Sequence, residues 1–181
     1  HAMSGWRIGY AAGTRKLIEK ITLFGANTTY SVCSVAQAAA VAALKPSFET
    51  ETALASLKSH IMQSRYAACS RLSLLSNVTF SWPEAGYFVL LDVRPLLGIV
   101  PGNATGFRTV QELCDHLLTH AAVVATDGAG FQAPGHIRLS FAGPEQMIAA
   151  AFDRIVRVLI TLPLGLEAAA RGIQDRGQAV G

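Results

Sequence analysis

Apolar residues recur at helical spacing in several stretches of the chain. In the longest of them Leu54, Leu57 and Ile61 share one stripe, which is typical of a helix that packs on one side. Pro46 ends a preceding alanine-rich stretch, and Pro144 stands where the last helix starts. The spacing predicts helices over 14–24, 34–44 (with Ser31 as an alternative start), 51–75, 109–120 and 144–159.

Short apolar runs alternate with these helices. The run Tyr87–Val93 is rich in aromatic and β-branched residues, which favour strands. Trp6–Ala11 is apolar enough to be covered on both faces, as in a parallel sheet. Strands are predicted over 6–11, 78–82, 87–93, 122–125 and 135–141, a loop over 95–106, and a short added helix or a frayed tail over 163–181.

The composition is that of a piece of a globular protein with much apolar surface to cover. Of 181 residues, 51% are hydrophobic and 15% are charged. An average soluble domain has a larger fraction of charged residues. The excess fits surface that further protein or a partner subunit covers. The net charge of +3 is dispersed, so we expect no nucleic-acid binding, and no apolar stretch has the length of a membrane span. The N-terminus lacks a secretion pattern, which predicts a cytoplasmic location.

The metal-ligating residue types are sparse. Cys33, Cys69 and Cys114 are widely spaced and odd in number, which argues against a disulfide framework or a zinc site. His116 and His120 are spaced to share a helix face, but the glutamate of the metalloprotease pattern does not stand between them. We therefore predict no metal site.

Two arginines stand in strand-like segments that are flanked by glycine: Arg7 in SGWRIGY and Arg138 in FQAPGHIRLS. A guanidinium is a planar, permanently charged fork that grips a phosphate or carboxylate through two parallel hydrogen bonds. An arginine among apolar residues also fits a structural ion pair, for which Asp92 or Asp127 is the candidate partner of Arg138. The residues alone leave both roles open.

The segment around Arg7 resembles the stretch that follows the cofactor lysine in class I/II pyridoxal-phosphate aminotransferases. Three further segments resemble that family in the same order along the chain. They are NTTYSVCSVAQAAAVAAL at 27–44, PEAGYFVLLD at 83–92, and GAGFQAPGHIRLSFA at 128–142, where the family carries its substrate arginine. Four segments in order are far more specific than any one of them.

The resemblance implies an α/β fold of the fold-type I class, of which the chain would be the C-terminal part. A remnant of the large cofactor-binding domain, with a strand and helices, would occupy 1–46. The small α+β C-terminal domain would occupy 47–162, and a C-terminal tail 163–181. The boundary is expected within about four residues of Pro46, where the helical pattern breaks.

The resemblance also implies pyridoxal 5'-phosphate as cofactor, an amino acid and a 2-oxo acid as substrates, and a homodimer. Arg7 would bind the cofactor phosphate, Arg138 the α-carboxylate of the substrate, and Phe131 would lie near the substrate side of the pocket. A proline is common in the family just before Gly128, whereas this chain has Asp127 there. The local turn and its charge are therefore expected to differ.

The family's cofactor lysine falls before His1, and the ring-stacking aromatic residue and the aspartate at the pyridine nitrogen lie further upstream. Lys16, Lys20, Lys45 and Lys58 have polar or charged neighbours, as surface amines do. We predict no catalytic residue in this segment and no transaminase activity of the isolated chain. A cofactor absorbance band that borohydride traps on any of these lysines would contradict this expectation.

Two other classes of function stay open. A related pyridoxal-phosphate lyase or synthase would keep both arginines and differ elsewhere in the pocket. An aminotransferase-like effector domain of a transcription regulator would carry a winged-helix segment upstream. The amino-acid specificity is not readable from these residues.

Overall fold

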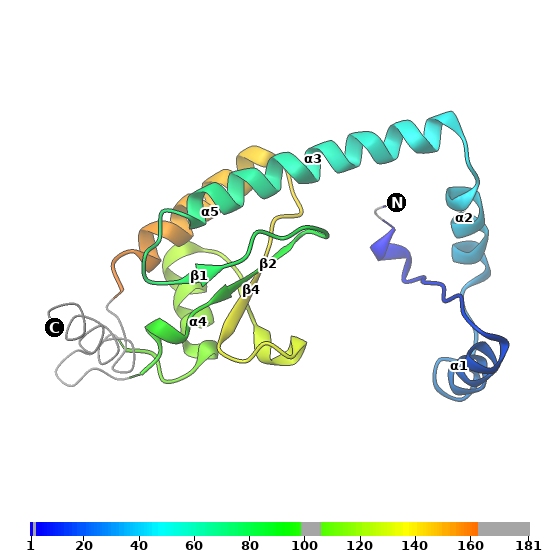
Figure 1. Ribbon diagram of the computed structural model, residues 1–181, viewed down its shortest axis with the longest axis horizontal. Helices are drawn as coiled ribbons and strands as arrows, with labels where there is room; N and C mark the ends of the chain where they lie inside the picture. Colours follow the sequence, from blue (N-terminus) through cyan, green and yellow to red (C-terminus); the bar gives the residue numbers. More distant parts are fainter. Residues whose placement is uncertain (2, 99–105, 163–181) are drawn as a thin grey trace, which may run out of the picture. The chain divides into compact units, whose positions relative to one another are not determined.

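The computed structural model (Figure 1) describes residues 1, 3–98 and 106–162, and its contacts divide the chain into two units, His1–Lys58 and Ser59–Gly181. Each unit is described by itself. The predicted tail 163–181 and residues 99–105 of the predicted loop lie outside the described residues. The fold class is that predicted, a mixture of helices and sheet.

The first unit is helical. A 3-10 turn, η1 (Ser4–Trp6), precedes α1 (Arg15–Thr28) and α2 (Ser34–Leu44), and α3 (Phe48–Leu72) begins in this unit. The strand predicted at Trp6–Ala11 is wrong. A strand needs a hydrogen-bonded neighbour, and the described part of this unit contains no strand.

Helix α1 extends to Thr28, four residues beyond the end of the predicted helix 14–24. The side chains of Asn27, Thr28 and Thr29 each donate to a backbone carbonyl one turn earlier, at distances of 2.7, 2.9 and 3.2 Å. These polar side chains thus fold back onto the last turns of the helix, and the backbone N–H groups of Thr29 and Tyr30 both donate to the Gly25 carbonyl where the chain turns.

Little of the first unit is buried. Ala36 is the one buried hydrophobic residue among its described residues, whereas Leu23, Phe24 and Tyr30 are 67%, 71% and 84% exposed. Apolar side chains gain stability by leaving water. The first unit therefore has an incomplete core by itself.

The second unit is built on a four-stranded antiparallel sheet of order β1-β2-β4-β3. Its strands are β1 (Thr79–Phe80), β2 (Phe88–Asp92), β3 (Thr126–Asp127) and β4 (His136–Ser140). The two long central strands, β2 and β4, lie inside the predicted strands 87–93 and 135–141. The strand predicted at 122–125 is displaced, because Ala122 adopts a left-handed conformation that ends the preceding helix and pairing begins only at Thr126.

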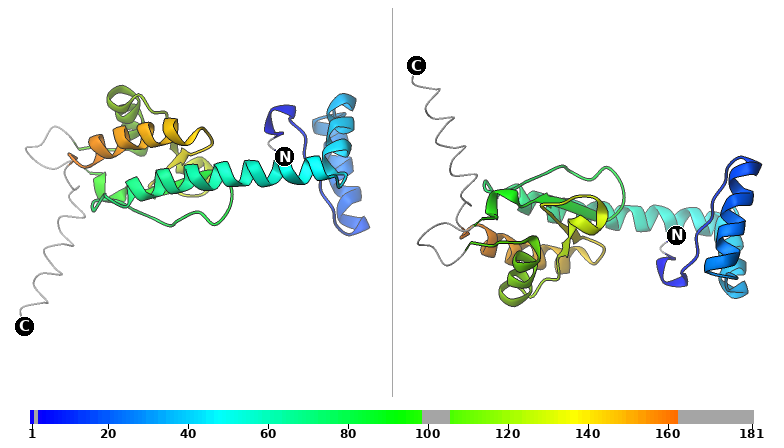
Figure 2. Two further views of the ribbon diagram at one scale, coloured as in Figure 1. Left: turned by 90° about the horizontal axis from the view of Figure 1, so that it is seen from above. Right: turned by 90° about the horizontal axis from the view of Figure 1, so that it is seen from below.

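Helices cover one face of this sheet. The part of α3 from Ser59 onward, α4 (Val110–Ala121) and α5 (Glu145–Leu159) enclose one core with the inward side chains of β2 and β4 (Figures 1 and 2). Because side chains alternate along a strand, every second residue of these strands enters that core. The inward set consists of Val89, Leu91, Val93, Ile137, Leu139 and Phe141.

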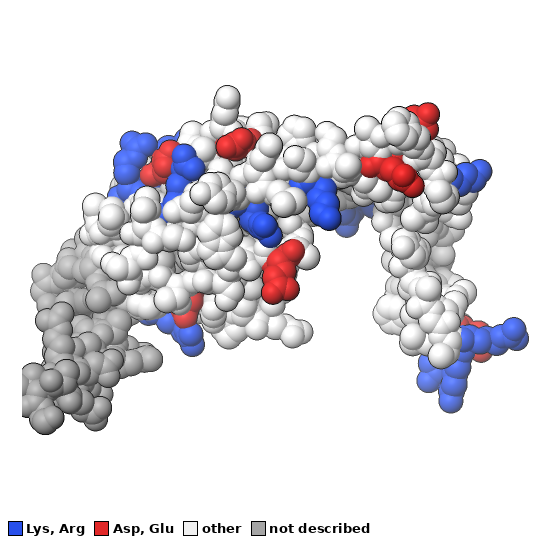
Figure 3. Space-filling view, turned by 45° about the horizontal axis from the view of Figure 1, so that its top comes forward, with Lys and Arg blue, Asp and Glu red and all other residues white. Residues whose placement is uncertain are grey.

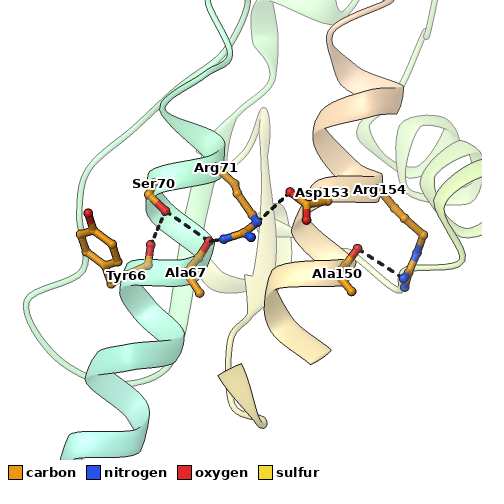
Figure 4. Close-up of polar contacts among 7 residues, drawn as sticks. All are labelled: Tyr66, Ala67, Ser70, Arg71, Ala150, Asp153 and Arg154. Atoms are coloured by element: carbon orange, nitrogen blue, oxygen red, sulfur yellow. Dashed lines mark hydrogen bonds and ion pairs between the residues drawn. The ribbon is translucent and has the colours of Figure 1, made fainter. Parts of the chain in front are cut away.

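Polar contacts fix the helices of the second unit to one another. Arg71 of α3 donates from Nε to Asp153 of α5 at 2.7 Å, as Figure 4 shows, so the two helices lie side by side. The buried Ser64 hydroxyl donates to the Gly143 carbonyl at 2.7 Å. Since α3 runs without a break from Phe48 past Lys58, the assignment of 1–46 and 47–162 to two domains stays a prediction.

Candidate functional site

The uncovered face of the sheet carries the candidate site. Outward positions on β2 and β4 alternate with the core positions, so Phe88, Leu90 and Asp92 share this face with His136 and Arg138. Arg138 stands opposite Leu90 on one side and Thr126 on the other. The arginine therefore lies within the sheet, where two neighbouring strands restrict its backbone.

An open pocket of about 590 Å³ lies over this face. Its floor comes from the outward side chains of the central strands, and its walls come from the β1 region and from the 3-10 turn η3 (Gly128–Phe131). Most of its lining is apolar, and Arg138, His136 and Asp92 supply its charged or titratable groups. The lining residues are Thr79, Phe80, Ser81, Trp82, Pro83, Phe88, Leu90, Asp92, Phe131, His136 and Arg138.

The guanidinium of Arg138 contacts two aromatic rings. Its Cζ lies 4.2 Å from the ring centroid of Phe88 and 3.6 Å from that of Phe131. Its Nε is buried without a hydrogen-bond partner, and the described residues form no ion pair with it. The Nη nitrogens likewise make no hydrogen bond to a described residue, so the charged fork is suited to an anionic ligand from the pocket.

The two candidate carboxylates of a structural ion pair are engaged elsewhere. Asp92 accepts hydrogen bonds from Arg94 Nε at 2.9 Å and from the Arg94 backbone N–H at 3.0 Å. These bonds hold the pKa of Asp92 below its usual value, so the carboxylate stays charged. Asp127 accepts from the backbone N–H of Ala129 at 2.8 Å. Neither carboxylate neutralises Arg138.

Asp127 also explains how the chain turns where the family commonly has proline. Its side chain caps the first turn of η3, the turn that ends at Phe131. Gly128, next to it, is buried so closely that an added Cβ would lie 2.5 Å from the Ala133 carbonyl oxygen. An aspartate cap and a glycine without room for a side chain thus direct Phe131 toward Arg138.

The turn before β4 is equally restricted. Gly135 has a φ of +76°, and an added Cβ would lie 2.5 Å from Cγ of Arg94. Its carbonyl oxygen accepts from the Val93 N–H at 3.0 Å, one step beyond the paired strands. Gly135 therefore lets the Arg94 side chain cross the turn and reach Asp92, while β4 starts in register.

Arg7 lies in the first unit, in a different setting. It ends η1 in a left-handed conformation, with a φ of 52°, and its Nη1 donates to the Ser4 carbonyl at 3.1 Å. The side chain is exposed, and no described residue forms an ion pair with it. Of the three predicted site residues, the structure brings together Arg138 and Phe131, and Arg7 belongs to the other unit.

Phe88 lines the pocket and contacts Arg138, but it is not among the residues predicted from the sequence. The apolar pattern of Tyr87–Val93 predicts its strand, but it does not say which face adjoins Arg138. The pairing Phe88↔Ser140 and Leu90↔Arg138 makes Phe88 a diagonal neighbour of the arginine. That register depends on contacts between distant parts of the chain.

The histidine pair forms a contact of its own. The rings of His116 and His120 lie 4.2 Å apart, and burial together with the His120 charge holds the pKa of His116 below its ordinary value. Within residues 1, 3–98 and 106–162, no three potential ligands are grouped to hold a metal ion.

The cysteines carry free thiols: Cys33 is exposed, and Cys69 and Cys114 are buried. Burial, with Asp127 and Asp115 nearby, raises the pKa of Cys114 to about 11, which makes it a poor nucleophile near neutrality. None of the helices that the structure describes is long and apolar enough to cross a membrane. On the face drawn in Figure 3, basic and acidic side chains are interspersed.

Comparison with known proteins bears directly on this pocket. The family model for aminotransferase class I and II matches residues 1–155. The chain belongs to this family. The match includes Arg7, Phe131 and Arg138 within its range.

Individual proteins with similar sequences are aminotransferases as well. The chain is 33% identical over 158 residues to an aspartate aminotransferase of Bacillus sp. (strain YM-2) and 30% identical over 157 residues to that of Bacillus subtilis (strain 168). Each alignment covers 87% of this chain and 38% of the relative. The chain thus spans well under half the length of the curated relatives that it matches.

Solved structures show the same correspondence. The aspartate aminotransferase of Rhizobium meliloti matches with a TM-score of 0.68 and 27% identity, over 90% of this chain and 40% of that one. The Thermus thermophilus enzyme described with maleate matches with a TM-score of 0.71 and 28% identity, over 87% and 38%.

The turn before β4 gives a test of how the site is built. Gly135→Ala should lower the free energy of unfolding of the chain by about 1–3 kcal/mol, because alanine is strained at positive φ and its Cβ would displace Arg94. Gly130→Ala is the matched control, since its Cβ enters open space at ordinary φ, and it should change stability by less than about 0.5 kcal/mol. Urea denaturation measures both, and equal losses would contradict this role of Gly135.

Proposed function

We propose that the enzyme containing this chain is a pyridoxal-phosphate-dependent aminotransferase, which moves an amino group between an L-amino acid and a 2-oxo acid. The single observation that carries the proposal is the guanidinium of Arg138, which is partly buried, borders a pocket and has no ion-pair partner in the described part of the chain. A structural arginine in that setting would have a carboxylate partner. Family membership supplies the class of reaction.

Arg138 is proposed to bind the α-carboxylate of the substrate. Its two Nη nitrogens carry no hydrogen bond to any described residue, and the acidic side chains nearby are occupied by Arg94 and by the η3 cap. A carboxylate would satisfy the guanidinium through charge-assisted bonds. The Thermus thermophilus neighbour is described with maleate, which is a dicarboxylate, and this supports the same class of ligand here.

Arg7 is proposed to bind the phosphate of the cofactor. Its side chain fits this group, because only one of its donors is engaged, by the Ser4 carbonyl, and no carboxylate in the described residues competes for the rest. The left-handed backbone at Arg7 sets the direction of the side chain at the end of η1. The family supports pyridoxal phosphate as the phosphorylated ligand.

The two arginines act by position. Pyridoxal phosphate, when bound, supplies the electron sink that stabilises a carbanion at the substrate Cα. Arg138 would fix the carboxylate end of the substrate, and Arg7 would fix the phosphate end of the cofactor. Fixing both ends removes rotational freedom that the reaction would otherwise have to lose. No residue of this chain is proposed to make or break a bond.

Assembly and location belong to the same proposal. The exposed apolar side chains of the first unit favour a homodimer, or cover by the rest of the enzyme, because they have no core of their own. The free thiols favour a reducing compartment such as the cytoplasm. We assign residues 1–46 to a large cofactor-binding domain, 47–162 to the small domain and 163–181 to a tail.

Arg138→Ala in the complete enzyme should lower kcat/KM for amino acids by roughly a hundredfold or more, because a charged and orienting pair of hydrogen bonds is lost. Amines that lack a carboxylate should lose much less. The measurement is steady-state transfer of isotope-labelled amino nitrogen from each substrate to a 2-oxo acid.

Equal losses for amino acids and amines would show that Arg138 supports the fold, and the carboxylate assignment would then be wrong. If the unaltered enzyme transfers no labelled nitrogen and instead releases ammonia or eliminates a substituent, it is a lyase of the same family. If it does neither reaction, an effector-binding role replaces catalysis.

Arg7→Ala in the complete enzyme should weaken cofactor binding by about 2–4 kcal/mol, because the phosphate dianion would lose a guanidinium that donates two hydrogen bonds to it. Arg7→Lys should recover part of that loss, because it keeps the charge but not the fork. Titration of the apoenzyme with pyridoxal phosphate measures both variants. Unchanged affinity in Arg7→Ala would remove Arg7 from the cofactor site.

A further inference from the structure

We propose that Phe88 and Phe131 are positioning residues, which hold the guanidinium of Arg138 in place while leaving its N–H donors free for a carboxylate. This inference rests on the proposed function of Arg138 and adds a role for the two rings beside it. The rings come from separate elements, Phe88 from β2 and Phe131 from η3. They are proposed to act through the arginine, without contacting the reacting atoms.

The distances place both rings in the range of cation–π attraction. The Cζ of Arg138 is 4.2 Å from one centroid and 3.6 Å from the other, well inside the limit of about 6 Å for such contacts. A ring face attracts the guanidinium through its negative quadrupole and uses none of the N–H donors. Contact with two such faces restricts a side chain that otherwise has many rotamers.

Arg94, two residues after the end of β2, shows the alternative way to hold an arginine. Its guanidinium donates from Nε and Nη2 to the two carboxylate oxygens of Asp92, so its charge is paired within the chain. Arg94 is thereby held by a carboxylate that compensates its charge. Arg138 is fixed by rings instead, so its donors remain available.

The exposure of the two rings supports a role outside the core. Phe88 is 36% and Phe131 is 49% exposed, and both line the pocket rather than the core on the opposite face of the sheet. Apolar rings at a solvated surface contribute little to the core. Their contact with the Arg138 guanidinium is therefore the interaction to which we assign their role.

The first test uses kinetics of the complete enzyme. Phe88→Leu and Phe131→Leu should each lower kcat/KM for amino acids by about threefold to thirtyfold, the range that corresponds to one cation–π contact. Most of the change should appear in KM, because the arginine spends less time in the binding geometry. Amines that lack a carboxylate should change by less than about twofold, and Phe88→Tyr, which keeps a ring face, should stay near the unaltered enzyme.

Tyr66→Leu is the matched control. It removes an exposed ring that lies 6.2 Å from the Trp82 ring, centroid to centroid. The described rings against Arg138 are those of Phe88 and Phe131, so Tyr66 is not one of them. This variant should leave kcat/KM for both substrate types unchanged.

A second readout needs no activity. The Nε–H resonance of Arg138, followed by NMR with selective arginine labelling in the complete enzyme, should be displaced by the ring currents of Phe88 and Phe131. It should move toward the position of a free arginine in Phe88→Leu and Phe131→Leu, but not in Tyr66→Leu. Titration with succinate should require higher concentrations in the two ring variants.

The outcomes separate the two proposals. If Arg138→Ala shows no loss that is selective for carboxylate substrates, the proposed function fails. If Arg138→Ala shows that loss while Phe88→Leu and Phe131→Leu keep unaltered kinetics and an unaltered Nε–H resonance, the positioning role is wrong. Equal losses for amines and amino acids in the folded ring variants would also overturn it, since the rings would then support general structure.

Discussion

The feature on which the rest of this site depends is a guanidinium to which none of the described residues supplies a carboxylate. Arg138 lies on a central strand, within a pocket whose lining is mostly apolar, and two rings border it. Charge in such a place is costly unless it is paired. Under the proposed function, a substrate carboxylate would supply the missing partner, and pairing with Arg138 would contribute to its binding energy.

The surrounding structure keeps nearby carboxylates from pairing with Arg138. Asp92, which stands on the same face of the sheet, is occupied by Arg94, and Gly135 gives the Arg94 side chain room to reach it. Asp127 caps the turn that carries Phe131. The acidic groups that were candidates to neutralise Arg138 therefore serve to build the pocket instead. The same contacts that stabilise the turns also keep these two carboxylates away from the Arg138 guanidinium.

Much of the second unit was predictable from its residues, because periodic apolar patterns specify helices and long strands locally. The strands 87–93 and 135–141 and the helix beginning after Thr109 were recovered for that reason. The strand expected at Trp6–Ala11 failed because a strand exists only with a partner, which a local pattern does not reveal. Arg138 and Phe131 were predicted from a resemblance, whereas Phe88 needed the pairing register of β2 and β4.

The most direct measurement is a crystal structure of the complete enzyme with bound maleate. One maleate carboxylate should lie about 2.7–2.9 Å from two guanidinium nitrogens of Arg138, with Phe88 and Phe131 still against the guanidinium and Asp92 still bound to Arg94. An Arg138 that is paired with an aspartate of its own chain, with maleate bound elsewhere, would contradict the assignment of this arginine to the substrate carboxylate.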